Sequence, residues 1–152
     1  MRLLVLLLIV AAGSSAVTAQ PVSDLPSISG IEWASGPDDC ASVSSIELGQ
    51  TVTATLVEAT ACEYIDGSAA DYYALDLEAD TRVVITHRSD DFDAFLALIQ
   101  ENGVLVASDD DSAGGPTGFD ATVSVHLSAG RYLIAANHIE GDGEYQLTVR
   151  AE

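Results

Sequence analysis

The chain of 152 residues is long enough for one domain with a single sizeable core. It carries 24 acidic residues against five basic ones, all arginine, which gives a formal net charge of −19. So few basic groups cannot neutralise phosphates, which excludes nucleic acids and anionic membrane surfaces as partners. Cations, neutral or basic partners and adaptation to a saline habitat remain open, because salt screens the self-repulsion of a highly charged protein.

Residues 1–19 have the pattern of a secretory signal peptide. Arg2 gives a positive start, residues 3–12 are apolar without interruption, and Val17-Thr18-Ala19 fits the small-x-small cleavage pattern. An uncut membrane anchor is the alternative, but a run of about ten apolar residues is too short for a bilayer, which needs about 20. We therefore expect cleavage before Gln20, a secreted or periplasmic protein, and no membrane anchor.

Residues 20–39 are expected to form an extended lead-in to the domain. They hold three of the four prolines with serine and glycine between them, and residues 31–33 could add one short strand. The single tryptophan, Trp33, lies in this segment. A lone tryptophan could anchor a ligand, although it more often packs beside a core. The domain itself is expected to cover residues 40–152.

Cys40 and Cys62 are the two cysteines of the chain, so only one intramolecular pairing exists. Secretion would place them in an oxidising compartment, and neither has a CxxC partner or a neighbouring histidine that would indicate metal binding or catalysis. We therefore expect a structural disulfide between Cys40 and Cys62. In the chain-entropy model, closing a loop of this length stabilises the fold by about 3 kcal/mol.

From Ile46 onward the apolar residues recur with period two, which predicts β-strands and no helix. Turn sequences separate about eight short strands, a spacing typical of an antiparallel sandwich or barrel. The predicted strands are residues 51–57, 71–77, 82–88, 94–100, 104–108, 121–127, 131–137 and 144–150. Glu101-Asn102-Gly103 is the most distinctive hairpin turn.

The alternation also predicts which side chains point inward. One face of each strand is apolar, and the expected inward sets include Val52, Ala54 and Leu56; Tyr73, Leu75 and Leu77; Val123 and Val125; and Tyr145, Leu147 and Val149. Among the phenylalanines we expect Phe95 to be the core residue. Tyr64 and Tyr72 fall outside the inward register, so we expect them to be exposed ligand-binding residues that stack on a sugar ring or a protein strand.

Acidic clusters stand at the ends of several predicted strands. Calcium prefers six to eight carboxylate and carbonyl oxygens from flexible loops, and two such loops at one end of a sandwich could converge on an ion. Aspartates in these places also cap turns by accepting backbone N–H bonds, so both interpretations stay open. The candidate calcium ligands are Asp90, Asp91, Asp93, Asp109, Asp110, Asp111 and Asp120.

The remaining polar residues give no catalytic pattern. His87, His126 and His138 fall on three different strands without the close spacing of zinc ligands, and we expect them to be exposed or half-buried. There is no GxSxG elbow, and carboxylate pairs arise by chance in so acidic a chain. The sequence therefore favours a protein that is not an enzyme.

Residues 40–149 resemble the bacterial pre-peptidase C-terminal domain, a family that includes the collagen-binding domains of collagenases. No single motif is specific, but their order and spacing match over most of the expected mature chain. The matching segments are Cys40, 48–52, Leu56, Cys62, Asp71-x-Tyr73-x-Leu75-x-Leu77, Phe92-Asp93-x-x-Leu96-x-Leu98, Asn102-Gly103, Asp109-Asp110, Leu127-x-Ala129-Gly130-x-Tyr132 and Gly143-x-Tyr145-x-Leu147-x-Val149.

The resemblance implies a jelly-roll-like β-sandwich. In the family, this domain comes after the enzyme domain of secreted peptidases or other hydrolases and aids secretion or substrate attachment. In some relatives calcium binds at acidic positions that correspond to Asp93, Asp109 and Asp110, and Asp71 would be structural. We expect a noncatalytic binding module that attaches to an extracellular protein or polysaccharide surface, with calcium as a candidate stabilising ion. The alternative is an inhibitor-like partner that docks on a separate secreted hydrolase.

Overall fold

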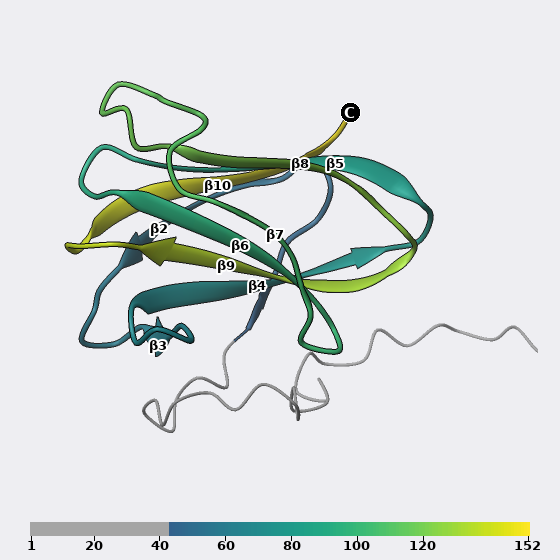
Figure 1. The fold of residues 1–152 in the computed structure, drawn as a ribbon, viewed down its shortest axis with the longest axis horizontal. Helices are drawn as coiled ribbons and strands as arrows, with labels where there is room; N and C mark the ends of the chain where they lie inside the picture. Colours follow the sequence, from purple (N-terminus) through teal and green to yellow (C-terminus); the bar gives the residue numbers. More distant parts are fainter. Residues whose placement is uncertain (1–42) are drawn as a thin grey trace, which may run out of the picture.

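A computed structural model describes residues 43–152, which form two β-sheets packed face to face (Figure 1). The predicted signal peptide, the lead-in with Trp33, and Cys40 lie outside these residues, so the expectations for them stay predictions. Within the described range there is no helix that could cross a membrane.

Ten strands make up the described part of the chain. They are β1 (Ser44–Ser45), β2 (Thr51–Leu56), β3 (Cys62–Glu63), β4 (Ala69–Leu77), β5 (Thr81–Ser89), β6 (Ala94–Gln100), β7 (Leu105–Asp109), β8 (Ala121–Leu127), β9 (Gly130–His138) and β10 (Gly143–Ala151). All eight strands that the periodicity predicts are present, each within two residues of its expected ends. The prediction missed β1 and β3, because two residues are too few to show a period.

The six-stranded sheet has the order β1-β4-β9-β6-β7, with β3 pairing to β4 beside β1, and the four-stranded sheet has the order β2-β10-β5-β8. Every pairing is antiparallel except the short one between β1 and β4, which is parallel. The all-β, jelly-roll-like sandwich is therefore confirmed, with one short parallel edge that the sequence did not predict.

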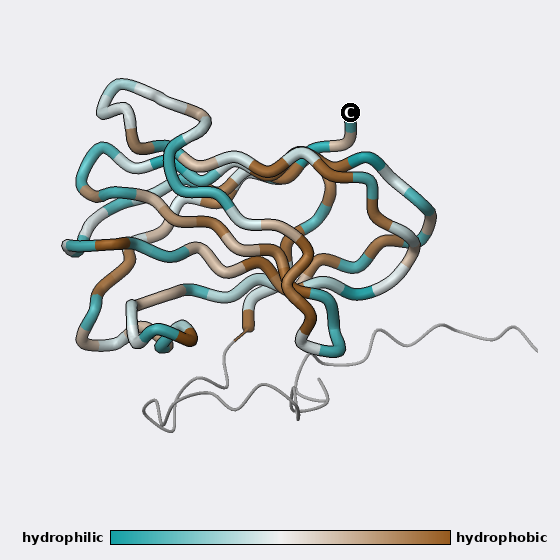
Figure 2. The backbone as a smooth tube through the Cα atoms, in the orientation of Figure 1, coloured by the Kyte–Doolittle hydropathy of each residue, from teal (hydrophilic) through white to brown (hydrophobic). Residues whose placement is uncertain are grey.

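The main core lies between the two sheets and is built from the inward side of every long strand. Leu75, Leu96 and Ile134 of the six-stranded sheet meet Ile85 and Leu147 of the four-stranded sheet, and all five are fully buried. Hydrophobic residues follow the strands, whereas the loops at the ends are largely hydrophilic (Figure 2). The predicted inward sets are confirmed, with Val52, Ala54 and Val125 partly buried at the margin of the core.

The phenylalanines depart from the prediction. Phe92, in the loop before β6, is the one that enters the main core, with 6 % of its surface exposed. Phe95 has the opposite orientation to the core residues Ala94 and Leu96 and packs on the outer side of the six-stranded sheet. The expectation that Phe95 is the core phenylalanine is therefore wrong, because the side chains of β6 alternate and the leucines take the inward positions.

The hairpin between β6 and β7 has the predicted turn. Gly103 has a φ of +86°, a left-handed conformation that glycine adopts without a steric penalty. The Asn102 side chain accepts a hydrogen bond from the Val104 backbone N–H at 3.1 Å, and Gly103 N–H donates to the Gln100 carbonyl at 2.8 Å. These bonds fix the register that brings β7 to the edge of the sheet.

The opposite orientations of Leu147 and Gln146 on β10 provide a test of the register. Leu147→Ala removes a fully buried side chain between the sheets and should lower the free energy of unfolding by about 2–5 kcal/mol. Gln146→Ala, on the exposed side of the same strand, should change it by less than about 0.5 kcal/mol. Urea unfolding followed by circular dichroism measures both, and equal effects would contradict the assigned register.

Candidate functional site

Three loops meet at one end of the sandwich, which we call the acidic end. They are the β5–β6 loop (residues 90–93), the β7–β8 loop (residues 110–120) and the β9–β10 turn (residues 139–142), all on the left in Figure 1. Backbone bonds join them: Ala94 N–H donates to the Phe119 carbonyl at 3.1 Å, and Ile139 N–H donates to the Asp93 carbonyl at 3.0 Å. The acidic loops therefore lie at the same end of the sandwich, and their convergence on an ion stays a prediction.

Several of the candidate calcium ligands hold backbone groups in these loops. Asp109 Oδ2 accepts from Ser112 N–H at 3.1 Å and from Thr122 N–H at 2.8 Å, which ties the start of the β7–β8 loop to its end. Asp91 Oδ2 accepts from Glu144 N–H at 2.9 Å, which ties the β5–β6 loop to β10. For Asp91 and Asp109 the turn-capping interpretation fits directly.

Asp120 is the most buried of the predicted ligands, with 1 % of its surface exposed. Its Oδ2 lies 3.5 Å from Arg88 Nε, which is an ion pair without a well-formed hydrogen bond. The carboxylate occupies the space where a β-carbon on Gly115 would stand. Gly115 also has a φ of +74°, so both its conformation and this close approach require glycine.

Asp93 differs from these capping aspartates. Burial raises the pKa of Asp93, and the nearby charges of Asp110 and Asp111 raise this pKa further. Its Oδ1 is buried and accepts no hydrogen bond from the residues that the structure describes. Asp110 Oδ1 accepts from Asp111 N–H, and both residues are exposed, as is Asp90. Within residues 43–152 no three acidic, histidine or cysteine side chains are gathered closely enough to hold one metal ion.

Two of the three histidines are buried behind the acidic end, which contradicts the expectation of exposed or half-buried side chains. His87 is 0 % and His138 3 % exposed, and both rings contact Phe92 at centroid distances of 5.8 and 5.7 Å. Burial lowers the pKa of His87 to about 4, and the neighbouring His138 contributes to the shift. His126 is exposed on β8, as expected. The burial arises because the loop that carries Phe92 closes over this end.

Tyr145 links the two sheets by a buried hydroxyl chain. Its hydroxyl donates to Asp71 Oδ2 at 2.7 Å, and the Tyr73 hydroxyl, 2.6 Å away, therefore donates to the Tyr145 oxygen. Burial raises the pKa of Tyr145, and also that of Asp71 despite the hydrogen bond from Tyr145. Asp71, placed by the family resemblance at a structural position, serves as the acceptor that ends this chain.

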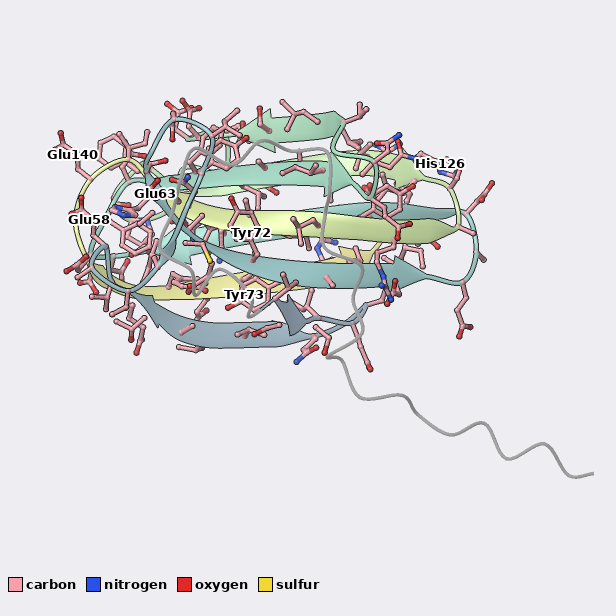
Figure 3. The ribbon with its side chains drawn as sticks, turned by 90° about the horizontal axis from the view of Figure 1, so that it is seen from below. Glu58, Glu63, Tyr72, Tyr73, His126 and Glu140 are labelled. Atoms are coloured by element: carbon pink, nitrogen blue, oxygen red, sulfur yellow. The ribbon has the colours of Figure 1, made fainter. Side chains whose placement is uncertain are left out.

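Tyr64 and Tyr72 are not exposed, so the expectation of a solvent-facing stacking platform is wrong. Each has 6 % of its surface exposed, although both point away from the main core as predicted. Tyr64 packs against Phe95 at a ring-centroid distance of 5.7 Å, and Tyr72 donates to the Glu63 carbonyl at 3.3 Å. Figure 3 shows the molecule from below the view of Figure 1, with Tyr72 near the middle and His126 at one end. A ligand-binding role for these tyrosines stays a prediction.

Cys62 is partly buried in β3, opposite Ala70 of β4. The parallel pairing of β1 places Ser44 opposite Tyr73, so Val43 stands level with Tyr72. Two residues of β4 separate these levels by about 7 Å, and the three residues from Val43 back to Cys40 can span about 10 Å. A disulfide needs Cα atoms only about 4.4–6.8 Å apart. The Cys40–Cys62 bridge stays a prediction, and the chain length permits it.

The outer face of the four-stranded sheet is polar and carries a feature that the sequence analysis missed. Four threonines stand opposite one another, one on each strand: Thr51 on β2, Thr148 on β10, Thr86 on β5 and Thr122 on β8. Their hydroxyls are paired, with Oγ1–Oγ1 distances of 3.0 Å for Thr51–Thr148 and 3.2 Å for Thr86–Thr122. Four threonines on strands far apart in the chain could be aligned only once the register was known.

Arginines gather on the same face, which we call the threonine–arginine face. Arg82 and Arg88 project from β5 and Arg150 from β10, and all three are exposed, as is His126 beside Arg82. Arg82 Nε lies 2.6 Å from Glu152, while Arg88 lies beside Asp120. Three of the five arginines of the chain lie on this face. The face is therefore close to neutral in a strongly acidic protein.

The comparisons with known proteins agree with this fold. A model of the bacterial pre-peptidase C-terminal domain matches residues 69–151, more than half of the chain. The chain belongs to this family. The family predicted from the order of short motifs is therefore confirmed, and the match covers β4 to β10 of this pre-peptidase C-terminal domain. A search of the curated proteins finds no match.

Two solved structures are similar to the chain. The pre-peptidase C-terminal domain of collagenase from Bacillus anthracis has a TM-score of 0.57 at 17 % identity, and the match covers 72 % of this chain and 95 % of that one. This likeness shows the fold. A periplasmic inhibitor of g-type lysozyme from Aeromonas hydrophila has a TM-score of 0.37 at 11 % identity, covering 72 % of this chain and 97 % of that one. A score this low supports no argument about fold or partner.

The buried His87 predicts acid sensitivity. A histidine with a folded pKa of about 4 and an unfolded pKa near 6.5 binds protons more readily when unfolded. The neutral His87 makes its full contribution to stability above pH 6.5. As the pH falls towards 4, the free energy of unfolding decreases by about 3 kcal/mol. His87→Gln should remove this part of the pH dependence, measured by urea unfolding between pH 7 and pH 4.

His126→Gln is the matched control, because His126 is exposed on a neighbouring strand. Asp71 and Asp93 have raised pKa values and act in the opposite direction, since protonation favours their folded form. The comparison is therefore made between variant and parent at each pH. If the free energy of unfolding of His87→Gln fell between pH 7 and pH 4 as much as that of the parent, the buried histidine would not be the source of the acid sensitivity.

Proposed function

We propose that this protein is a noncatalytic, secreted or periplasmic accessory module that attaches to a protein or polysaccharide surface through its threonine–arginine face. The observation that carries the proposal is the row of four threonines across β2, β10, β5 and β8, flanked by exposed arginines. Family membership supports a β-sandwich module, and the signal-peptide pattern of residues 1–19 supports export.

The geometry of this face suits an extended polymer. The threonine row crosses three strand spacings, about 14 Å, which is the length of about four extended peptide residues. Short hydroxyl side chains lose little conformational freedom on binding and can both donate and accept hydrogen bonds. Arg150 and Gln146 add longer donors on the exposed side of β10. An array of this kind favours repeated contacts over a surface rather than enclosure of a small molecule.

Electrostatics also favours this face over the rest of the molecule. The net charge of −19 opposes the approach of any acidic partner, and the acidic end concentrates part of it. On the threonine–arginine face the carboxylates of Glu152 and Asp120 are matched by Arg82 and Arg88. A neutral or mildly acidic polymer would meet less repulsion here than on any acidic surface of the protein.

Binding to insoluble polymers tests the proposal. Thr53→Glu combined with Gln146→Glu places two carboxylates opposite each other on the exposed side of β2 and β10. We expect this double variant to lose at least about tenfold in affinity, or about 1.4 kcal/mol, for whichever fibrous protein or polysaccharide retains the parent in a pull-down panel.

The matched control is Ile65→Glu combined with Leu105→Glu, which adds the same charge at two exposed positions away from this face. The control should bind like the parent. Equal loss in both double variants would mean that net charge, not this face, governs attachment. Turnover of a peptide or glycoside panel by the pure protein would contradict the noncatalytic role.

The proposal includes a calcium site at the acidic end, formed by Asp93 with Asp110 and Asp111. The charges of Asp110 and Asp111 near Asp93, and a buried Asp93 oxygen that accepts no hydrogen bond within residues 43–152, are chemically suited to a hard cation. Because no three ligands are gathered in residues 43–152, the β5–β6 and β7–β8 loops would have to move together around the ion. Calcium would then stabilise the end of the sandwich that holds the buried histidines.

Thermal unfolding at fixed ionic strength, in EDTA and then in excess calcium, tests this site. A ligand that binds only the folded state adds about 2.7 kcal/mol at a hundredfold excess over its Kd. Asp93→Asn should abolish the calcium-dependent rise in Tm, whereas Asp90→Asn, an exposed neighbour on the same loop, should retain it. An equal rise with any salt would show that these carboxylates form only a solvated surface.

A further inference from the structure

Two large apolar side chains are exposed at the acidic end, although the loops that carry them are strongly charged. Phe119 has 48 % and Ile139 has 52 % of its surface exposed. Ala94 N–H donates to the Phe119 carbonyl, and Ile139 N–H donates to the Asp93 carbonyl. The two residues therefore flank the start of β6, one on each side, about two strand spacings or 10 Å apart. We call Phe119 and Ile139 the apolar pair.

Exposed carboxylates surround the apolar pair in the same three loops. Glu58, in the β2–β3 loop (residues 57–61), lies at this end too, because its backbone N–H donates to Asp142 Oδ1 at 2.7 Å. Figure 3 shows Glu58 and Glu140 at one end of the molecule and His126 at the other. Each of the three loops contributes two exposed carboxylates, and within residues 43–152 none of the six forms an ion pair: Asp90, Asp91, Asp110, Asp111, Glu140 and Asp142.

The arginines lie mainly at the other end of the sandwich. Arg82 and Arg131 stand at the start of β5 and β9, two strands that run towards the acidic end, and Arg150 stands near the end of β10, which runs away from it. Of the four arginines in residues 43–152, only Arg88 lies near the acidic end, where it faces Asp120. This separation of charge makes the acidic end the part of the described domain that attracts and orients a cationic partner.

An apolar centre within a charged rim has the anatomy of a protein interface. The apolar centre leaves water when the partner binds, and the polar rim fixes the partner's orientation. A metal ion would satisfy carboxylates but would leave the apolar pair in water. A neutral polymer would cover the apolar pair but would leave the carboxylates without opposite charges. A basic protein surface, on which lysine or arginine surrounds an apolar side chain, satisfies both features.

We propose that the acidic end docks a basic protein partner. An apolar side chain of the partner packs on Phe119 and Ile139, and its lysine or arginine side chains face the six surrounding carboxylates. The docking surface contains none of the threonine row, so a domain attached through the threonine–arginine face still presents it. This inference goes beyond the proposed function and does not depend on it, since the basic partner binds whether or not any polymer does.

Two peptides of equal charge, each blocked at both termini, test the docking: Lys-Lys-Phe-Lys-Lys and Lys-Lys-Gly-Lys-Lys. Titration of the full chain, purified from its host cell, is followed by residue-resolved NMR in EDTA, which keeps calcium away. We expect the phenylalanine peptide to bind at least about fivefold more tightly than the glycine peptide. Its shift changes should centre on residues 90–93, 110–120 and 139–142. Equal affinity for the two peptides, or shift changes centred elsewhere, would overturn the proposal.

Variants of the apolar pair separate its contribution from that of charge. Phe119→Ser combined with Ile139→Ser should lower the affinity for the phenylalanine peptide to that for the glycine peptide, and should leave the latter unchanged. The matched control is Val104→Ser combined with Leu105→Ser, which removes two side chains of similar exposure, 55 % and 51 %, at the opposite end of the sandwich. The control should bind both peptides like the parent, and equal loss in the two double variants would contradict the docking surface.

The charged rim has its own variants. Asp110→Asn combined with Asp111→Asn keeps a side-chain oxygen for the Asp111 N–H and should weaken both peptides about threefold. Glu47→Gln combined with Glu78→Gln makes the same change of net charge at exposed positions of the opposite end and should have a smaller effect. An equal effect would assign the binding to net charge alone and overturn the proposal. None of these variants alters the threonine row, so failure of the docking and failure of polymer attachment are distinguishable.

Discussion

Alternation of side chains along the strands is the constraint on which the rest of the structure depends. In the four-stranded sheet β2 (TVTATL), β8 (ATVSVHL) and β10 (GEYQLTVRA) obey it strictly and place polar residues at every second position, whereas β5 (TRVVITHRS) departs from it at Val84. This sheet can therefore bury one face and expose the other. In the six-stranded sheet β6 (AFLALIQ) and the middle of β9 have apolar residues at both the inward and the outward positions. Such strands are stable only when both faces are covered, and the two sheets consequently have different outer surfaces.

The same constraint explains why the polar chemistry is concentrated at one end. Inward positions along the middle of the strands are aliphatic, whereas at the acidic end they become His87, His138, Tyr145 and Asp71. Tyr145 and Asp71 satisfy each other across the sheets, but His87 Nε2 and both ring nitrogens of His138 make no hydrogen bond within the described protein. Unsatisfied buried groups cost free energy. This end is therefore a part of the sandwich in which protonation can change stability.

The sequence predicted what is decided locally. Eight strands, the inward sets and the Gly103 hairpin follow from period two and turn chemistry, and the family followed from the order of motifs. It failed where burial depends on a distant segment. Tyr72 was correctly placed outside the main core, but its burial needs Tyr64 and the neighbouring strands. His87 is buried because Phe92, five residues away in a loop, folds over it. The threonine row required the register of four strands that are not consecutive in the chain.

The two outer faces together limit how the domain can attach to a partner. The Debye length is about 8 Å at physiological ionic strength, so the carboxylates of the acidic end act only weakly across the length of the sandwich. At the threonine–arginine face the exposed ion pair between Arg82 and Glu152 is itself worth little. The proposed contacts there would depend on short-range hydrogen bonds from hydroxyl, amide and guanidinium groups, which depend less on the net charge of the protein than long-range attraction does. A strongly acidic protein can therefore keep the solubility that its charge provides and still bind an uncharged surface through one flat face.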